Sequence, residues 1–320
     1  MPKLHIDTDL GGDIDDLCAL AMVLNWPDAE LLAVTTVAEH QGKRAGYVGY
    51  VLGLADRKDI PVAAGAAVSL DCYRSWQGLP DEIVYWPEPI TPVQNSLDQA
   101  LSLLERSIEQ GAIIVAVGAL TNLALLEKRS PGILHRAKLY LMGGYVFAPR
   151  GGFPQWGNEI DFNVQIDVQS AYYVIEHSSP TFVPLAVTVE TSLRRANLPR
   201  LRQAGPVARL IARQAEAFAT YENYEAQYGQ TCKRLPEDII NFLHDPFACA
   251  IGLGWREGVE ISEIPLKSEI RDGWLRHAID ASGKPTQVVT RVNAEKFDEF
   301  WLSTVARQNN QNSVAPVARA

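Results

Sequence analysis

Short apolar runs alternate with amphipathic runs along most of this chain. Continuous apolar stretches of strand length occupy residues 4–7, 30–37, 60–63, 112–117, 138–142 and 181–187. Runs with the helical period accompany them, at residues 16–25, 42–55, 95–110, 121–128 and 167–176. Apolar strands without period-two alternation are typical of sheets that are covered on both faces. The order therefore predicts an α/β fold, with a doubly wound, mainly parallel central sheet flanked by helices in a single domain.

Three segments lack this simple alternation. Residues 66–92 are rich in Trp, Tyr and Pro and have no clear period, which predicts a long ordered loop near a functional site. Residues 206–235 are mostly helical in pattern and carry a tyrosine cluster. The end of the chain, residues 309–320, is polar and rich in Ala and Pro, so we expect a flexible tail after one domain over residues 1–308.

The densest chemical signal follows the first apolar run. Five aspartates lie within ten residues there: Asp7, Asp9, Asp13, Asp15 and Asp16. A helix cap and the helix dipole account for one or two acids at such a position, but not for five. Anions gathered this closely repel one another, whereas Ca²⁺ takes six to eight oxygen ligands, largely from carboxylates. We therefore predict a metal-centred active site at the carboxyl end of the first strand.

Other polar segments follow predicted strands at residues 118–124 and 142–163, and one more precedes a predicted helix at residues 243–247. The first could offer a backbone carbonyl as a metal ligand, or it is a plain strand–turn–helix unit with Thr121 as the helix cap. The last places His244 and Asp245 directly before a helix, where a capping acid beside an incidental histidine is the alternative. Because the carboxyl ends of parallel strands share one sheet edge, these residues are expected near the acidic loop.

The middle segment carries a run of amides and acids suited to reading the hydroxyl groups of a sugar. Its candidate residues are Asn158, Asp161 and Asn163. An ordinary polar loop is the alternative interpretation of the same run. The segment therefore points to a sugar-containing ligand only in combination with the acidic loop.

Composition narrows the class of partner. The formal net charge of −9 disfavours a general nucleic-acid or anionic-membrane binder. The four cysteines are scattered without a CxxC pair, which disfavours structural zinc and suits a reducing compartment. No apolar run is long enough to span a bilayer, and no secretory leader precedes the first strand. We expect a cytoplasmic protein that acts on a small molecule.

Taken together, these segments resemble the inosine–uridine-type nucleoside hydrolases, in the same order over nearly the whole chain. The shared runs are DTD-x-G followed by DD, VTTVA, PVAAG, GALTN, MGG, DFN with Asp167 four residues later, and a late HDP. The resemblance implies hydrolysis of the N-glycosidic bond of ribonucleosides. It also implies one Ca²⁺ that binds the ribose hydroxyls and the attacking water, and a homodimer or homotetramer.

Roles carry over by position from this resemblance. The implied Ca²⁺ ligands are Asp9, Asp16, the carbonyl of Thr121, and Asp245. The implied general base is Asp15, and the implied acid near the leaving base is His244, a residue type that titrates near physiological pH. The implied ribose contacts are Met142, Asp161 and Asn163.

Several positions depart from the family pattern. The acidic loop is two residues longer than the commonest form, so alignment on the strand instead of the helix puts Asp13 in the place of Asp15. Asp13 therefore stays an alternative base, ligand or substrate contact. Asp161 stands where a glutamate is usual, and Glu39-His40 stands where an asparagine is common. His40 is therefore expected to point at the sugar, with a surface histidine as the alternative.

Tyr224 and Tyr228, with Tyr221 before them, are spaced three and four apart and predict one aromatic stripe on a helix. Such a stripe could cap the site and stack on the base, or pack against the body of the protein. Two rival functions are also open. One is a phosphatase that uses Asp7 as its nucleophile, and the other is a relative that binds or hydrolyses a different ribosyl compound.

Overall fold

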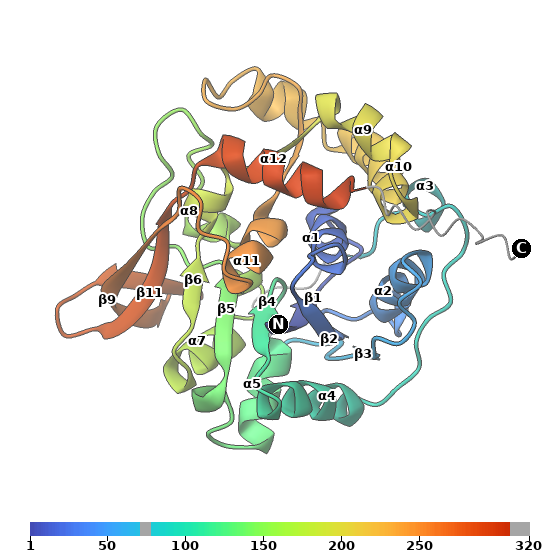
Figure 1. Cartoon of the computed structure of the whole chain (residues 1–320). Helices are drawn as coiled ribbons and strands as arrows, with labels where there is room; N and C mark the ends of the chain where they lie inside the picture. Colours follow the sequence, from blue (N-terminus) through green and yellow to red (C-terminus); the bar gives the residue numbers. More distant parts are fainter. Residues whose placement is uncertain (71–77, 308–320) are drawn as a thin grey trace, which may run out of the picture.

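The computed structural model describes residues 1–70 and 78–307 of the chain. The predicted tail at 309–320 and part of the predicted loop at 66–92 lie outside the described residues. Within the described part, one sheet of nine strands runs through the protein in the order β10-β9-β11-β6-β5-β4-β1-β2-β3 (Figure 1). None of the described helices combines the length and apolar content that crossing a bilayer requires.

The strands of the sheet are mainly parallel. They are β1 (Lys3–Thr8), β2 (Glu30–Thr36), β3 (Val62–Ala64), β4 (Ile113–Ala116), β5 (Lys138–Met142), β6 (Thr181–Val183), β9 (Glu260–Arg271), β10 (Trp274–Ile279) and β11 (Lys284–Arg291). Only β9 runs antiparallel to its neighbours, β10 and β11. A second, two-stranded antiparallel sheet pairs β7 (Ser192–Arg194) with β8 (Ile239–Phe242). The doubly wound, mainly parallel sheet predicted from the sequence is confirmed.

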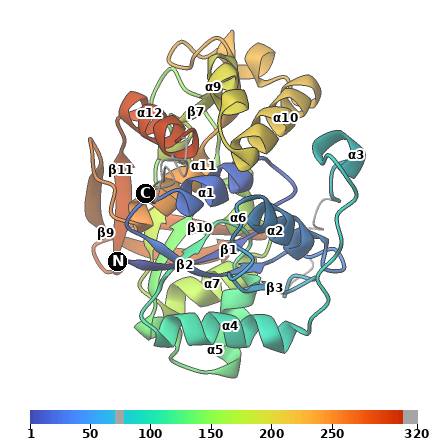
Figure 2. The same ribbon diagram turned by 45° about the vertical axis from the view of Figure 1, so that its right-hand side comes forward.

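Helices cover both faces of the sheet. One apolar core draws on α1 (Asp15–Leu24), α2 (Lys43–Leu54), α10 (Pro206–Tyr221), α11 (His244–Gly252) and α12 (Ala294–Val305). The other draws on α4 (Leu97–Glu109), α5 (Thr121–Arg129) and α7 (Val168–His177). In Figure 2, α4 and α5 lie on one side of the sheet, and α10 and α12 lie on the other. Burial of both faces explains why the parallel strands are apolar without alternation.

Shorter helical elements complete the described fold. They are α3 (Glu82–Tyr85), α6 (Phe162–Gln165), α8 (Leu185–Thr188), α9 (Leu198–Gln203), the 3₁₀ helices η1 (Leu134–Arg136), η2 (Asn158–Ile160) and η3 (Arg195–Asn197), and the π-helical turn η4 (Glu225–Gly229). The predicted strand at 181–187 was too long, because Pro184 ends β6 and α8 starts at the next residue. The C-terminal strands β9 to β11 were missed.

A hairpin signal was available for the missed strands. Asp272 and Gly273 join β9 to β10 with φ angles of 54° and 73°. An Asp-Gly pair between two extended runs is the usual sequence of a tight hairpin turn, because both residues must take positive φ.

The chain winds outward in both directions from β1, which lies between β2 and β4. The strand order therefore reverses direction at β1, and open α/β sheets have a crevice beyond the carboxyl ends of the strands at such a point. The acidic loop leaves β1 at this crevice. The topology thus places the predicted metal-centred site where open α/β sheets bind their ligands.

Candidate active site

A cavity of about 640 Å³ lies beyond the carboxyl ends of β1, β2, β4 and β5. Most of the predicted site residues line it: Asp9, Asp13, Asp15, Asp16, Met142, Asp161, Asn163, Tyr224, Tyr228, His244 and Asp245. Three predicted residues, Thr121, His40 and Asn158, are not among its lining residues. The structure therefore gathers side chains from distant parts of the sequence around one cavity.

Three carboxylates form a tight cluster at the centre of the cavity wall. Asp15 and Asp16 begin α1, Asp245 lies in the first turn of α11, and one oxygen of each lies within 4.8 Å of the others. All three side chains are buried. Burial, and then the neighbouring carboxylates, raise the pKa of each well above its usual range. Such a group needs protons or a cation, and an all-oxygen donor set suits a hard divalent ion.

Local hydrogen bonds hold this cluster in place. The hydroxyl of Thr8, the last residue of β1, donates to Asp16 Oδ1. The backbone N–H of Asp245 lies 3.4 Å from Asp15 Oδ2, which joins the start of α11 to the start of α1. These two helices pack against each other, so their first turns are brought to the same point. The cluster is therefore built by the packing of two helices that are far apart in sequence.

Asp9 and Thr121, two of the expected metal ligands, lie outside that cluster. Asp9 lines the cavity, and burial raises the pKa of its carboxyl group while the Arg44 guanidinium opposes the shift. The Thr121 hydroxyl donates to Asp167 Oδ2 at 2.6 Å, which anchors the first turn of α5. Ligation by the Thr121 carbonyl and by Asp9 stays a prediction.

Asp13 supports the entry into α1. Its Oδ1 accepts from the backbone N–H of Ile14 at 2.5 Å and of Asp15 at 3.3 Å, and also from the amide of Asn241. Burial raises the pKa of its carboxyl group to about 6. The side chain also lines the cavity, so both its capping geometry and its position fit a residue of the site.

Asp7 is buried beneath the site and is not among the residues that line the cavity. Its Oδ1 accepts from the Thr35 hydroxyl at 2.6 Å and from the Asn122 amide at 2.8 Å. Thr35 is bonded in turn to His5, at 2.9 Å. A nucleophile must reach its substrate, so this burial argues against the phosphatase alternative.

The predicted sugar-binding segment contributes Asp161 and Asn163 to the cavity lining. Asp161 is buried and accepts from the backbone N–H of Gly144 at 2.7 Å, and burial raises the pKa of its carboxyl group to about 7. The Asn163 amide donates to the carbonyl of Met142 at 3.1 Å. Both polar atoms of the Asn158 side chain are buried and have no hydrogen-bond partner within the described part of the chain. Buried polar groups are rarely left so, which indicates that a water or a ligand meets Asn158.

Aromatic side chains line the end of the cavity near His244. The rings of Tyr224 and Tyr228 lie 5.0 Å apart, and Trp156 meets Tyr228 at 5.3 Å and Phe242 at 5.1 Å. Phe242 stacks on His244, with centroids 5.2 Å apart and planes at 27°. Flat apolar walls of this kind suit an aromatic heterocycle.

The predicted stripe of three tyrosines is wrong. Helix α10 ends at Tyr221, and Asn223 takes a φ of 52°, which turns the chain before Tyr224. Tyr221 is 64% exposed and its ring lies 6.4 Å from that of Tyr85. Only Tyr224 and Tyr228 reach the cavity wall.

The pKa of His244 differs from the value expected from the sequence. Burial lowers the pKa of its imidazole to about 3, so the ring is neutral at neutral pH. Its Nδ1 lies 2.7 Å from the hydroxyl of Thr188. A neutral ring can still donate a hydrogen bond, but the ordinary histidine pKa, on which the acid role rested, does not apply in this structure.

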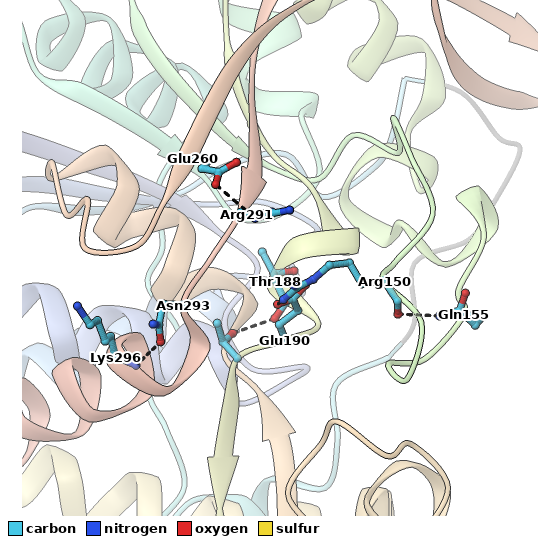
Figure 3. A network of polar contacts seen from close by, with 9 residues as sticks. Arg150, Gln155, Thr188, Glu190, Glu260, Arg291, Asn293 and Lys296 are labelled. Atoms are coloured by element: carbon cyan, nitrogen blue, oxygen red, sulfur yellow. Dashed lines mark hydrogen bonds and ion pairs between the residues drawn. The ribbon is translucent and has the colours of Figure 1, made fainter.

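An ion pair fastens the loop that carries Trp156. Arg150 Nε donates to Glu190 Oε1 at 2.6 Å, and Gln155 Nε2 donates to the Arg150 carbonyl at 3.1 Å (Figure 3). Glu190 is buried and follows α8, the helix that holds Thr188. The partner of His244 and the aromatic loop above it are thus attached to the same short helix.

Sequence reasoning missed Arg44, and His40 is not among the residues that line the cavity. Glu39 is buried, and its carboxylate accepts from backbone N–H groups at the start of α2, so Glu39 caps this helix. Arg44 lines the cavity instead, from the first turn of α2. A signal was present: Arg44 shares the buried face of that helix with Val48 and Val51 at helical spacing.

The fold and the acidic cavity define an α/β enzyme with an oxygen-rich site for a small polar substrate. A family model described as inosine-uridine preferring nucleoside hydrolase matches residues 4–299. The chain belongs to this family and is a nucleoside N-ribohydrolase.

Similar proteins agree with this assignment. A pyrimidine-specific ribonucleoside hydrolase RihA from Salmonella schwarzengrund is 30% identical over 304 residues, which cover 90% of this chain and 87% of that protein. The RihA of Klebsiella pneumoniae is 32% identical over 236 residues, 69% of this chain and 73% of that protein.

Solved structures share the fold. The plant nucleoside hydrolase PpNRh1 has a TM-score of 0.76 at 18% identity, covering 95% of this chain and 99% of that chain. A purine-preferring ribonucleoside hydrolase from Gardnerella vaginalis has a TM-score of 0.76 at 19% identity, covering 95% and 98%.

Proposed function

We propose that this chain hydrolyses ribonucleosides to ribose and a free nucleobase with the help of one bound Ca²⁺. The observation that carries the proposal is the group of three buried carboxylates, within 4.8 Å of one another, on the wall of a cavity that also has an aromatic end. Uridine and cytidine are the first substrates to test, because the RihA relatives are described as pyrimidine-specific.

The residues present fit a calcium ion. Asp16 and Asp245 would hold it with Asp9 and the carbonyl of Thr121, and every one of these donors is an oxygen. When bound, such an ion lowers the pKa of the attacking water and orients the ribose hydroxyls. The raised pKa values of the clustered carboxyl groups support this proposal, because a bound cation would relieve their mutual repulsion.

The chain's own residues perform three tasks. Asp15 would take the proton of the attacking water, and Asp13 is the alternative base at the same wall. The fixed carboxylates would stabilise the positive charge that develops on the sugar as the N-glycosidic bond breaks. Met142, Asp161 and Asn163 line the part of the cavity proposed to contact the ribose, and the unpartnered side chain of Asn158 lies in the same segment of the chain.

The aromatic end would hold the departing base. Tyr224 and Tyr228 would pack on its ring, and His244 would donate a hydrogen bond to it from a neutral imidazole. His40 is not among the residues that line the cavity, and the Glu39 carboxylate caps α2, so the proposal gives neither of them a role.

A reducing-sugar assay on a panel of ribonucleosides, with and without a calcium chelator, tests the proposal. Chelator-sensitive release of ribose, restored by added Ca²⁺, is the expected result. Release that persists in protein shown to be free of metal contradicts the calcium role. No release from protein loaded with Ca²⁺ contradicts the substrate assignment and favours a different ribosyl compound.

We further propose a cytoplasmic homodimer or homotetramer, as the family resemblance implies. Light scattering coupled to size-exclusion chromatography measures the assembly directly. A monomer at assay concentration contradicts this part of the proposal.

A further inference from the structure

A buried cation lies in the wall of the acidic cavity. Arg44 is 4% exposed, and it is the only Lys or Arg among the described residues that line the cavity. Arginine is almost never this buried unless its charge and its donors are satisfied. Its surroundings therefore indicate what the guanidinium does.

The guanidinium binds backbone carbonyls from two neighbouring strand ends. Its Nε donates to the carbonyl of Ala38 at 2.8 Å, beyond the end of β2. Its Nη1 donates to the carbonyl of Leu10 at 3.3 Å and to that of Asp9, both in the acidic loop after β1. One rigid, planar group thus joins the exit of β1 to the exit of β2.

The guanidinium makes no ion pair within the described residues, where no carboxylate oxygen lies within 4.0 Å of its nitrogens. The carboxylates of the cavity consequently keep their oxygens available for another cation. A residue that served only to neutralise the acids would be expected to touch one of them.

The turn between β2 and α2, which leads to Arg44, has an unusual backbone conformation. Ala38 and Gln41 take positive φ angles of 52° and 54°, and Gly42 takes 82°. Non-glycine residues adopt this conformation at a cost, and they keep it where the surrounding contacts enforce it. Glu39 caps the corner by accepting from the N–H groups of Gly42 at 3.0 Å and Ala45 at 2.8 Å.

We propose that Arg44 is a positioning residue that holds the acidic loop, and Asp9 in particular, in the conformation that binds the metal ion. This inference rests on the proposed metal dependence. Arg44 acts through the backbone of Asp9 and Leu10, so its geometry matters more than its charge.

Losing the backbone contacts of Arg44 and losing its positive charge should change the metal affinity in opposite directions. Removing a positive charge beside an anionic site strengthens the attraction for a cation. Removing a support of the ligand loop weakens metal binding, by about 10- to 100-fold where outer-shell contacts have been removed elsewhere. The two roles can therefore be separated by the sign of the change in affinity.

The test is a calorimetric titration of Ca²⁺ into metal-free wild-type protein, Arg44→Lys and Arg44→Met. The lysine variant keeps the charge and loses the planar fork, and the methionine variant loses both. We expect weaker Ca²⁺ binding in both variants, by about tenfold or more. Unchanged affinity in Arg44→Lys, or tighter binding in Arg44→Met, overturns the proposal.

Two controls make the result specific. Arg57→Met removes an exposed arginine, paired with Asp59, far from these contacts, and should leave the affinity unchanged. Wild-type protein that binds no Ca²⁺ refutes the proposed metal dependence itself, an outcome distinct from a wild type that binds and variants that bind equally well.

Chemical rescue separates positioning from a general loss of stability. In Arg44→Ala, guanidinium ions can enter the vacated space from the cavity. We expect guanidinium chloride, at a concentration too low to unfold the protein, to restore part of the Ca²⁺ affinity, and ammonium chloride at the same ionic strength to restore none. Weak binding in Arg44→Ala that guanidinium does not improve assigns the loss to destabilisation and overturns the positioning role.

Discussion

Replacing Asp245 with asparagine should stabilise the metal-free protein while it removes metal binding. Asp245 lies within 4.8 Å of both Asp15 and Asp16. Two unit charges at that distance repel by about 3 kcal/mol at an effective dielectric constant of about 20. Asparagine has nearly the same shape and no charge, so the change removes repulsion without opening a cavity.

The size of the effect depends on protonation. Each of the three carboxyl groups has a pKa raised by burial and by its neighbours, so protons relieve part of the repulsion at neutral pH. We therefore expect a gain of about 2 kcal/mol for Asp245→Asn in the free energy of unfolding, less than the full Coulomb value. A carboxyl group whose pKa is raised on folding destabilises the folded protein as pH rises. The wild type has this group at position 245 and the variant does not, so the stability gain of Asp245→Asn should grow toward alkaline pH.

Urea denaturation in a chelator, followed by circular dichroism at several pH values, measures this gain. The same measurement with Ca²⁺ at a hundredfold excess over its Kd should stabilise the wild type by about 2.7 kcal/mol and leave the variant unchanged. Added calcium should therefore remove the stability advantage that Asp245→Asn has over the metal-free wild type. A metal-free variant that is less stable than the wild type, at an unchanged m-value, would refute the reasoning.

Three further outcomes are expected. Asp15→Asn should lower kcat by about 10²- to 10⁴-fold with an unchanged circular dichroism spectrum, and near-normal kcat would move the base role to Asp13. His244→Ala should slow hydrolysis of natural nucleosides by about 10²-fold and of p-nitrophenyl riboside much less, since that leaving group needs no hydrogen bond; equal losses on both argue against contact with the base. Asp298 accepts from the Ser192 hydroxyl at 2.9 Å, and burial raises the pKa of its carboxyl group to about 7, so its contribution to stability is lost as pH rises from about 4 to about 7. Asp298→Asn should flatten the dependence of Tm on pH in that range, and a slope like that of the wild type would contradict this account.

Much of the fold could be predicted because local pattern and tertiary burial agree in its parallel half. The strand predicted at residues 138–142 coincides with β5, and the helix predicted at 42–55 differs from α2 by one residue at each end. Strands covered on both faces must be apolar throughout, so a continuous apolar run in the sequence predicts a buried strand. The C-terminal hairpin was missed although Asp272-Gly273 marked it, because its strands are largely exposed and their apolar content is low.

The chemistry of the site could be predicted where its residues lie in one short segment, the acidic loop. Five aspartates after the first strand predict a cation site without any knowledge of the fold, because carboxylates this close repel one another unless a cation or protons neutralise them. The pairing of that segment with Asp245 is not a local property. It depends on the packing of α1 against α11, which brings together residues more than two hundred positions apart.

The fold class, the family and the acidic segment of this protein can be predicted from its amino-acid sequence, since each is expressed in the types and order of neighbouring residues. Which side chains reach the cavity depends on the tertiary structure. It made Glu39 a helix cap, brought Arg44 into the cavity wall, separated Tyr221 from Tyr224, and lowered the pKa of His244 through desolvation. These outcomes depend on burial and on the direction of the backbone at a corner, which long-range packing sets and a one-dimensional pattern does not contain.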